Sequence, residues 1–271
     1  MKRAFTLPEM LVVLGVIVVL IAILFPIIGR VREAANQATC LSRLRQVAQA
    51  TITYCGDNEG SFPGAGNGAG QTNNLIAANY VPFDWIFWDT NAPPPFNDVN
   101  QSALAKYMNI GNGDVFRCPS DTLYRPNLNP NPHPGESLYY YSYSFNCFLG
   151  NSFPLSNLDA PFPGAYFGGT NHNVAGDHDN KIGQVKHPES IIMFIDEDQR
   201  TVNDGAWVVF ISNYDRLGAR HSLANDVLDP SNDPTKDVVD PTARGNVVFC
   251  DGHGEFVPRS EARNPANYNP Y

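Results

Sequence analysis

The aspartates near the C-terminal end of the chain are the clearest candidates for chemistry. Five of them occur in the segment ANDVLDPSNDPTKDVVDPTARG, residues 224–245. Calcium binds about six to eight oxygen ligands, and loops rich in aspartate, asparagine and backbone carbonyls supply them. The spacing does not follow the EF-hand pattern, so a solvated acidic loop is the alternative. The residues of this candidate calcium site are Asp226, Asp229, Asp233, Asp237 and Asp240.

The five cysteines are a second source of candidate sites. Cys40 and Cys55 are fifteen residues apart on one predicted helix, about 22 Å, which is too far for a disulfide. Cys118 and Cys147 lie in strand-like segments and are the favoured disulfide pair, since an exported protein can form disulfides. Alternatively, all five are small buried apolar residues. No Cys-x-x-Cys motif occurs, so spacing gives no support to a structural zinc site.

Motifs of known enzyme classes are missing from the sequence. It contains no GxSxG, no HExxH and no phosphate-binding glycine loop. His221, Asp251 and His253 could form an acid–base group, but Asp251-Gly252 is more simply a turn to which His221 is hydrogen-bonded. We therefore expect that the protein is not an enzyme and that, apart from the candidate calcium, it has no cofactor.

An apolar run near the N-terminus is the first of the elements that position these residues. Residues 10–28 contain no charged side chain, and a helix of this length spans about 28 Å, the thickness of a bilayer core. Lys2 and Arg3 precede the run, so we expect a cytoplasmic N-terminus and an exported C-terminal part. A cleaved secretory signal is the alternative, but no small-residue cleavage site follows the run.

The helix is predicted to continue beyond the apolar run. From Val31 to Cys55, apolar residues recur at steps of three and four, which is typical of an amphipathic helix. Residues 5–55 therefore form a predicted stalk helix, with an apolar, transmembrane part at 5–29 and an amphipathic part at 30–55. Pro26 interrupts the hydrogen-bond ladder and is expected to kink or locally melt the helix.

The remaining residues, 56–271, form a predicted exported, β-rich domain. Its strand-like segments are rich in aromatic and β-branched residues. Packing them against the amphipathic half of the stalk predicts an α+β fold: a long N-terminal helix on an antiparallel β-sheet domain with long loops. The strand-like segments are residues 114–121, 137–149, 189–197, 206–212 and 246–257, and a short helix is expected at 102–110.

Charge is divided unevenly between the two parts. The first 55 residues contain six basic and two acidic residues, whereas the other 216 contain 12 basic and 25 acidic ones. Parts that differ so much in charge are expected to meet different surroundings. The domain is too acidic for nucleic-acid binding.

The segment AFTLPEM, residues 4–10, resembles the processing site of type IV pilins and pseudopilins. The resemblance implies that residues 1–4 are a leader peptide, that a prepilin peptidase cuts between Ala4 and Phe5, and that the new amine of Phe5 is methylated. Ala4 stands where the family usually has glycine.

Motifs in the domain extend this resemblance. FRCPSD, SYSFN and NVVFCDGH resemble the pilin-like group with a His-x9-Asp-Gly signature. His221 and Asp251 are farther apart than nine residues, which implies an insertion around residues 223–242. Some major pseudopilins of type II secretion have a calcium loop near the C-terminus, which favours calcium in the acidic segment.

Glu9 has a specific role in this resemblance. A charged side chain in hydrocarbon costs about 2.5–3.5 kcal/mol on insertion scales, so it is retained where it has a partner. The resemblance implies that Glu9 pairs with the Phe5 amine of a neighbouring subunit and so fixes the axial register of a filament, and that Pro26 is the family's helix-interrupting proline. Alternatively, Glu9 only caps the start of the helix.

Together these features predict a structural subunit of a type IV pilus-like extracellular filament, a homopolymer assembled through the N-terminal helix. The implied partners are the prepilin peptidase, an inner-membrane assembly platform and, for the monomer, the membrane itself. The expected location is the inner membrane, then an extracellular or periplasmic filament. Two alternatives stay open: a pseudopilin of type II secretion or DNA uptake, and a membrane-anchored surface binding module with aromatic platforms at residues 81–88 and 137–143.

Overall fold

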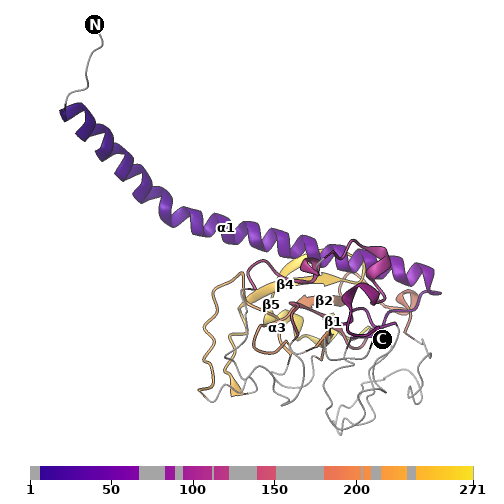
Figure 1. The fold of residues 1–271 in the computed structure, drawn as a ribbon. Helices are drawn as coiled ribbons and strands as arrows, with labels where there is room; N and C mark the ends of the chain where they lie inside the picture. Colours follow the sequence, from indigo (N-terminus) through magenta and orange to yellow (C-terminus); the bar gives the residue numbers. More distant parts are fainter. Residues whose placement is uncertain are drawn as a thin grey trace.

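The structure is a computed structural model with α+β architecture. A single long helix is followed by a domain built on a five-stranded sheet. In Figure 1 the C-terminal half of the helix lies across this domain, whereas its N-terminal half extends away from it. The structure describes residues 7–66, 83–88, 94–111, 113–121, 139–150, 180–202, 204–208, 215–230 and 236–270.

Helix α1 runs from Leu7 to Asp57, 51 residues in all. The helix continues through Pro26, so the local melting expected there does not occur. Figure 1 instead shows α1 bending gradually away from the domain. At its C-terminus the chain turns with Gly60 at φ 86°, and the Gly60 amide donates to the Cys55 carbonyl (2.8 Å). A glycine at positive φ is a common way to end a helix and satisfy its last carbonyls.

One face of the C-terminal half of α1 is buried in the domain. The buried positions recur at three- and four-residue steps, which places them on one side of the helix. The predicted apolar face began at Val31, but Val31, Ala34 and Ala38 are exposed, so close packing starts later. The buried residues of this face are Cys40, Leu44, Val47, Ala48, Thr51, Tyr54 and Cys55.

The sheet has the strand order β3-β1-β2-β4-β5 and is mixed rather than purely antiparallel as predicted. Three pairs are antiparallel, but β1 and β3 are parallel. Both β1 and β3 run opposite to β2. Because β3 pairs with the edge of β1 that faces away from β2, β1 and β3 are parallel neighbours. The strands are β1 Tyr143–Asn146, β2 Ile192–Asp196, β3 Ala206–Trp207, β4 Arg244–Phe249 and β5 Gly254–Pro258.

The sheet separates two apolar cores. The larger core lies between the sheet and α1, and the smaller one lies on the opposite face. Successive strand residues point to opposite faces, so Phe194 belongs to the larger core and Ile195 to the smaller one. This alternation directs Asp196, the last residue of β2, towards α1.

Two local predictions differ from the structure. The strand-like segment 114–121 forms a 3-10 helix and a loop, and the β4–β5 connection is a four-residue loop, residues 250–253, rather than a two-residue turn. Gly252 in that loop has φ 90°, a conformation that favours glycine. The short helices are η1 Val99–Gln101, η2 Ala105–Tyr107, η3 Asp114–Phe116, η5 Ile182–Gln184, α3 Arg259–Ala262 and η7 Pro265–Asn267.

Close packing behind β4 generates a first prediction. A Cβ atom on Gly245 would lie 2.2 Å from the Gly218 carbonyl oxygen and 2.6 Å from Leu217 Cγ. Gly245→Ala should therefore lower the free energy of unfolding by about 1–3 kcal/mol, the usual cost of overpacking. Urea denaturation in detergent, followed by tryptophan fluorescence, measures the change.

Gly183→Ala is the matched control, because nothing lies within 4 Å of a Cβ atom built there. The two variants should differ clearly in their urea midpoints. Equal midpoints would mean that the segment Leu217–Gly218 moves away from β4 at little cost.

Candidate functional site

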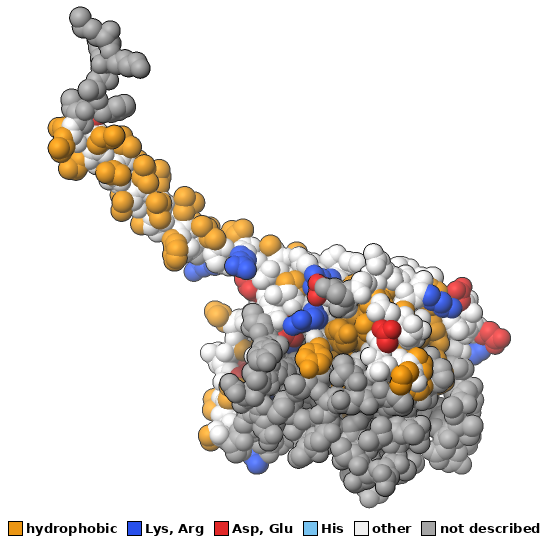
Figure 2. Space-filling model, in the orientation of Figure 1, with side chains coloured by type: hydrophobic (Ala, Val, Ile, Leu, Met, Phe, Trp, Pro, Cys, Tyr) orange, Lys and Arg blue, Asp and Glu red, His pale blue; other side chains and the backbone are white. Residues whose placement is uncertain are grey.

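The N-terminal half of α1 presents an exposed apolar surface, which we call the apolar stem (residues 7–28). None of its most apolar 18-residue stretch is buried, and Figure 2 shows apolar side chains along the part of α1 that projects from the domain. Its exposed large apolar residues are Leu7, Met10, Leu11, Val12, Val13, Leu14, Val16, Ile17, Val18, Val19, Leu20, Ile21, Ile23, Leu24, Phe25, Ile27 and Ile28.

Water is a poor solvent for the apolar stem. Covering a large aliphatic side chain is worth about 1.5–3 kcal/mol, so covering the whole stem is worth on the order of 20 kcal/mol. By length and composition, α1 is a candidate transmembrane helix. Signal sequences and buried core helices can have the same composition, but the stem is not buried in its own domain.

The sequence-predicted assembly residues fall at or next to the stem. Glu9 is exposed in the first turn of α1, where a carboxylate faces the positive end of the helix dipole. Pro26 lies within the helix, whereas Ala4, Phe5 and the rest of the predicted leader lie outside the described residues. The pairing of Glu9 with a neighbouring amine involves a second subunit and stays a prediction.

A second site, the junction cluster, lies where α1 meets the domain. It consists of Cys40, Cys118, Asp196 and His221, and one potential metal-ligating atom from each lies within 4.8 Å of the others. Cys40 is on α1, Cys118 follows η3, Asp196 ends β2, and His221 lies in the segment between β3 and β4. Among the described residues it is the one group of this kind.

The loop that carries Cys118 is attached to α1 by hydrogen bonds. Ser120 Oγ donates to the Glu33 carboxylate (2.8 Å) and accepts from Asn36 Nδ2 (3.0 Å). Arg43 donates to the Arg117 carbonyl (2.7 Å). These contacts place the residues of the FRCPSD motif against one side of α1, with Cys118 facing Cys40.

His221 is oriented by contacts to both of its ring nitrogens. Nδ1 is 2.6 Å from Glu33 Oε1, whereas Nε2 is 3.1 Å from Cys118 Sγ and 3.8 Å from Asp196 Oδ2. Burial opposes a charged imidazole, but the hydrogen bond to Cys118 and the nearby negative groups raise the pKa of His221. Burial likewise opposes ionisation of Glu33, yet hydrogen bonds from His221 and Ser120 lower its pKa.

The two cysteines of the junction cluster differ in acidity. A hydrogen bond from Cys40, together with His221 and Arg220, lowers the pKa of Cys118 to about 5 despite its burial. Burial, followed by the interaction with Cys118, raises the pKa of Cys40 well above its ordinary value. Tyr143 also donates to the Cys40 sulfur (3.5 Å). The geometry therefore favours a thiolate at Cys118 and a thiol at Cys40.

Asp196 introduces a fully buried carboxylate into the junction cluster. Burial raises its pKa to about 8, although the ion pair with Arg220 opposes this rise. Arg220 also pairs with Asp121 (3.3 Å), which accepts a hydrogen bond from Ser142 Oγ (2.6 Å). The cluster is thus enclosed by charged and polar groups and shielded from solvent.

The predicted calcium residues make other contacts. Asp226 pairs with Arg259 (2.7 Å), and Asp237 pairs with Arg200 (2.9 Å) and Arg216 (3.0 Å). A cation at this position would have to compete with arginines that already neutralise these carboxylates. Calcium binding by this segment stays a prediction.

Asp229 and Asp240, two further residues of the candidate calcium site, take part in hydrogen bonds within the acidic segment. The Asp229 amide donates to Asp237 (2.7 Å), and Asp240 accepts from the amides of Asn225 (3.1 Å) and Thr242 (2.9 Å). Asp233 lies outside the described residues. These bonds fold the acidic segment on itself through carboxylate-to-amide contacts.

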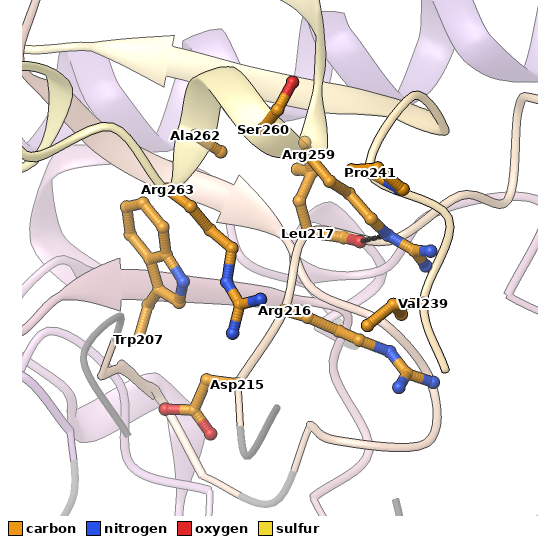
Figure 3. A pocket seen from close by; sticks show the side chains of 10 residues that line it. All are labelled: Trp207, Asp215, Arg216, Leu217, Val239, Pro241, Arg259, Ser260, Ala262 and Arg263. Carbon is orange, nitrogen blue, oxygen red and sulfur yellow. Dashed lines mark hydrogen bonds between the residues drawn. The ribbon is translucent and has the colours of Figure 1, made fainter. Parts of the chain in front are cut away.

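A cavity of about 60 Å³ lies beside the arginines of this region. Figure 3 shows the Arg263 guanidinium between Trp207 and Asp215, while the guanidinium groups of Arg216 and Arg259 lie nearer Val239. Arg259 Nε donates to the Leu217 carbonyl (2.8 Å), drawn as a dashed line. The cavity has room for a few water molecules and is well below the size of a typical ligand pocket.

Two sequence-based hypotheses differ from the structure. All five cysteines are free, so Cys118 is not joined to Cys147; its sulfur contacts His221 instead. The expected hydrogen bond between His221 and the Asp251 turn is replaced by the contacts to Glu33 and Cys118, whereas Asp251 pairs with His253 (2.6 Å).

The junction cluster itself was not predicted from the sequence. Its members come from four separate segments, and the supporting pair Glu33 and His221 are 188 positions apart. No local spacing could reveal such a group. The one signal in the sequence is the motif around Cys118, whose residue types instead favour a strand with a disulfide.

Comparisons with known proteins give no further assignment: no protein-family model, no curated protein and no solved structure matches this chain.

A group of buried carboxylates, one directly after β2 and two on either side of β3 in the chain, links stability to pH. Glu197 accepts hydrogen bonds from Ser144 Oγ (2.5 Å) and Thr201 Oγ1 (2.9 Å). Burial raises the pKa of Glu197, Asp204 and Asp215, that of Asp204 to about 7. A carboxyl group whose pKa is higher in the folded state contributes stability below its unfolded pKa, and this contribution is lost as pH rises through the folded pKa.

The stability of the Glu197→Gln variant, relative to the unmodified protein, should therefore increase as pH rises. Compared with the unmodified protein, its free energy of unfolding should increase between pH 5 and pH 8, because glutamine has no proton to lose. Urea denaturation at several pH values measures this difference. The exposed control Glu261→Gln should give a constant difference, and the same flat result for Glu197→Gln would contradict the expectation.

Proposed function

We propose that this protein is a structural subunit of a type IV pilus-like extracellular filament, anchored in a membrane by α1 before assembly and polymerised through the same helix. The observation that carries the proposal is the exposure of the whole apolar stem while the second half of α1 is packed on the domain. A bilayer covers such a stem in the monomer, and the stems of neighbouring subunits cover it in a filament.

The resemblance of residues 4–10 to a pilin processing site favours a filament over a simple anchor. In a lone anchor, a carboxylate at the start of the apolar segment gains the interaction with the positive end of the helix dipole, which does not require a second subunit. In a filament, Glu9 can pair with the Phe5 amine of the next subunit, and any other axial register would leave charges without that partner in an apolar core.

The alternative of an anchored binding module receives less support. It required the aromatic segment 81–88 to form an exposed platform, but Trp85, Phe87 and Trp88 are buried. Tyr139 and Tyr143 are buried as well. These side chains belong to the core. Among the described residues of the two segments, Tyr140 is the one exposed aromatic residue, and a single exposed ring is not a broad aromatic surface.

A pseudopilin of type II secretion or DNA uptake is the second candidate, since it would use the same stem and processing site. The two candidates differ in the location of the filament: a pilus extends from the cell surface, whereas a pseudopilus is a short filament in the periplasm. Electron microscopy of sheared cell-surface material, with mass spectrometry for this chain, distinguishes a surface pilus from a short periplasmic filament.

Assembly through Glu9 can be tested by substitution. Glu9→Ala should leave the membrane-bound amount of protein unchanged or higher, because a charge that is costly in hydrocarbon has been removed. The yield of sheared filaments should nevertheless fall by at least tenfold. Immunoblots of the membrane and sheared fractions measure both quantities.

Glu261→Ala, at an exposed position of α3, is the control and should assemble normally. Normal filament numbers with Glu9→Ala would disprove the pairing role. A loss from both membrane and sheared fractions would show instead that the variant is degraded, and Glu9→Gln would then repeat the test with a side chain of the same shape.

Processing gives an independent test of the proposal. The chain in filaments should begin at Phe5 and carry one N-terminal methyl group, because an attached leader would move the amine away from Glu9. Intact-mass measurement of sheared filaments determines this directly. Filaments whose subunits still contain Met1 would exclude the Phe5–Glu9 pairing.

A further inference from the structure

We propose that the junction cluster binds a single Zn²⁺-like divalent transition-metal ion through Cys40 Sγ, Cys118 Sγ, His221 Nε2 and Asp196 Oδ2. This inference rests on the geometry where α1 meets the domain and does not depend on whether α1 polymerises.

The donor set matches the preferences of such an ion. Two sulfurs, one imidazole nitrogen and one carboxylate oxygen are ligands that zinc accepts in four-coordinate sites, whereas calcium and magnesium prefer oxygen alone. The four residues contribute one atom each, which is the number that a closed structural site needs.

The spacing of the ligand atoms also fits. Bond lengths of about 2.0–2.3 Å at tetrahedral angles require ligand atoms about 3.3–3.8 Å apart. The observed separations are 3.1 Å from Cys118 Sγ to His221 Nε2, 3.6 Å from Cys40 Sγ to Asp196 Oδ2, and 3.8 Å from His221 Nε2 to Asp196 Oδ2. All four ligand atoms lie within 4.8 Å of one another, so an ion at the centre would require the more distant pairs to approach by about 1 Å or less.

The surroundings orient the ligands as in a metal site. Glu33 Oε1 lies 2.6 Å from Nδ1 of His221, and a carboxylate at this position favours a proton on Nδ1, so that Nε2, which faces the cluster, can bind an ion through its lone pair. A carboxylate behind a metal-bound histidine fixes its tautomer and raises its basicity. Arg220 holds one oxygen of Asp196 and leaves the other directed towards Cys40, whose sulfur also accepts from Tyr143.

Electrostatics provides a further reason for a cation. Cys118 and Asp196 place two acidic groups side by side in a region that excludes water, and Arg220 supplies one positive charge that it also shares with Asp121. Buried charges are costly unless they are compensated. A dication would allow both sulfurs and the carboxylate to be ionised together, and the protons displaced from them would go to solvent.

A disulfide between Cys40 and Cys118 is the competing explanation, because the exported compartment permits it. A disulfide would not account for the convergence of His221 and Asp196 on the same two sulfurs, nor for the support of His221 by Glu33. The test must therefore distinguish a metal from an oxidised pair.

The burial of the ligands indicates a structural role. The side chains of His221 and Asp196 are 0 % exposed, and the residues Cys40 and Cys118 are 0 % and 2 % exposed. An ion held there would connect α1 with β2 and with the segments that carry Cys118 and His221. Because it binds the folded state, it would raise the stability of the attachment between stalk and domain.

The first experiment measures metal content in the full chain. Protein purified in detergent without chelator should contain about one zinc per chain by elemental analysis, and cobalt substitution should give the sulfur-to-cobalt charge-transfer absorption of a thiolate site. Cys40→Ala should lose the metal, whereas Cys55→Ala, a buried cysteine on the same helix, should retain it. Equal metal contents of the two variants, or a metal-free unmodified protein that also fails to take up added Zn²⁺, would overturn the proposal.

A second variant covers the case in which Cys40→Ala does not fold. Glu33 is partly exposed, with 43 % of its side chain accessible, so Glu33→Gln should leave the fold intact. It should weaken Zn²⁺ binding about 10–100-fold in competition with a chromophoric chelator, the usual effect of removing a supporting carboxylate. Unchanged affinity would contradict the proposed role of Glu33 and His221.

Intact-mass measurement of the denatured, non-reduced protein completes the test. Free thiols at Cys40 and Cys118 together with bound zinc support the metal site. A chain lighter by two hydrogens, with a Cys40–Cys118 disulfide found by peptide mapping and no bound metal, would overturn it.

Discussion

The apolar stem imposes the main physical constraint on this molecule. Its side chains lie beyond the reach of their own domain, so the stabilisation available from covering them, on the order of 20 kcal/mol, is gained only in a bilayer or against other apolar helices. The domain can only attach to the remaining part of α1. The N-terminal half of α1 is therefore left exposed, and the sheet and its connecting segments are built against the C-terminal half.

The attachment between α1 and the domain combines apolar packing with buried polar contacts. Leu44, Val47 and Tyr54 bury the helix in the larger core, and this apolar contact has no strong directional preference. The contacts of Glu33 and Arg43 with the FRCPSD loop, and the convergence of four ligand-type side chains at Cys40, are directional. They define the position of the helix along and around its axis.

On the opposite face of the sheet, buried charges are arranged differently. Arg216 and Arg259 pair with aspartates of the acidic segment, which folds that segment onto the domain. Removing one partner of such a buried pair is costly because the other charge is left uncompensated. The acidic segment, which the sequence favours as a calcium loop, thus has a structural role in the described part of the chain.

The sequence by itself determined the features that depend on local pattern. An uncharged run predicts an apolar helix, and a three- and four-residue period predicts that one side of it packs, because each depends on neighbours in the chain. The structure places the start of that packed side later, at Cys40, and puts Asp251-Gly252 in a four-residue loop. The tertiary structure alone decided the parallel pairing of β1 with β3, the arginine partners of Asp226 and Asp237, and the junction cluster. Cys118 and His221 are 103 positions apart, and their contact depends on how separate elements pack, which leaves no periodic signal in the sequence.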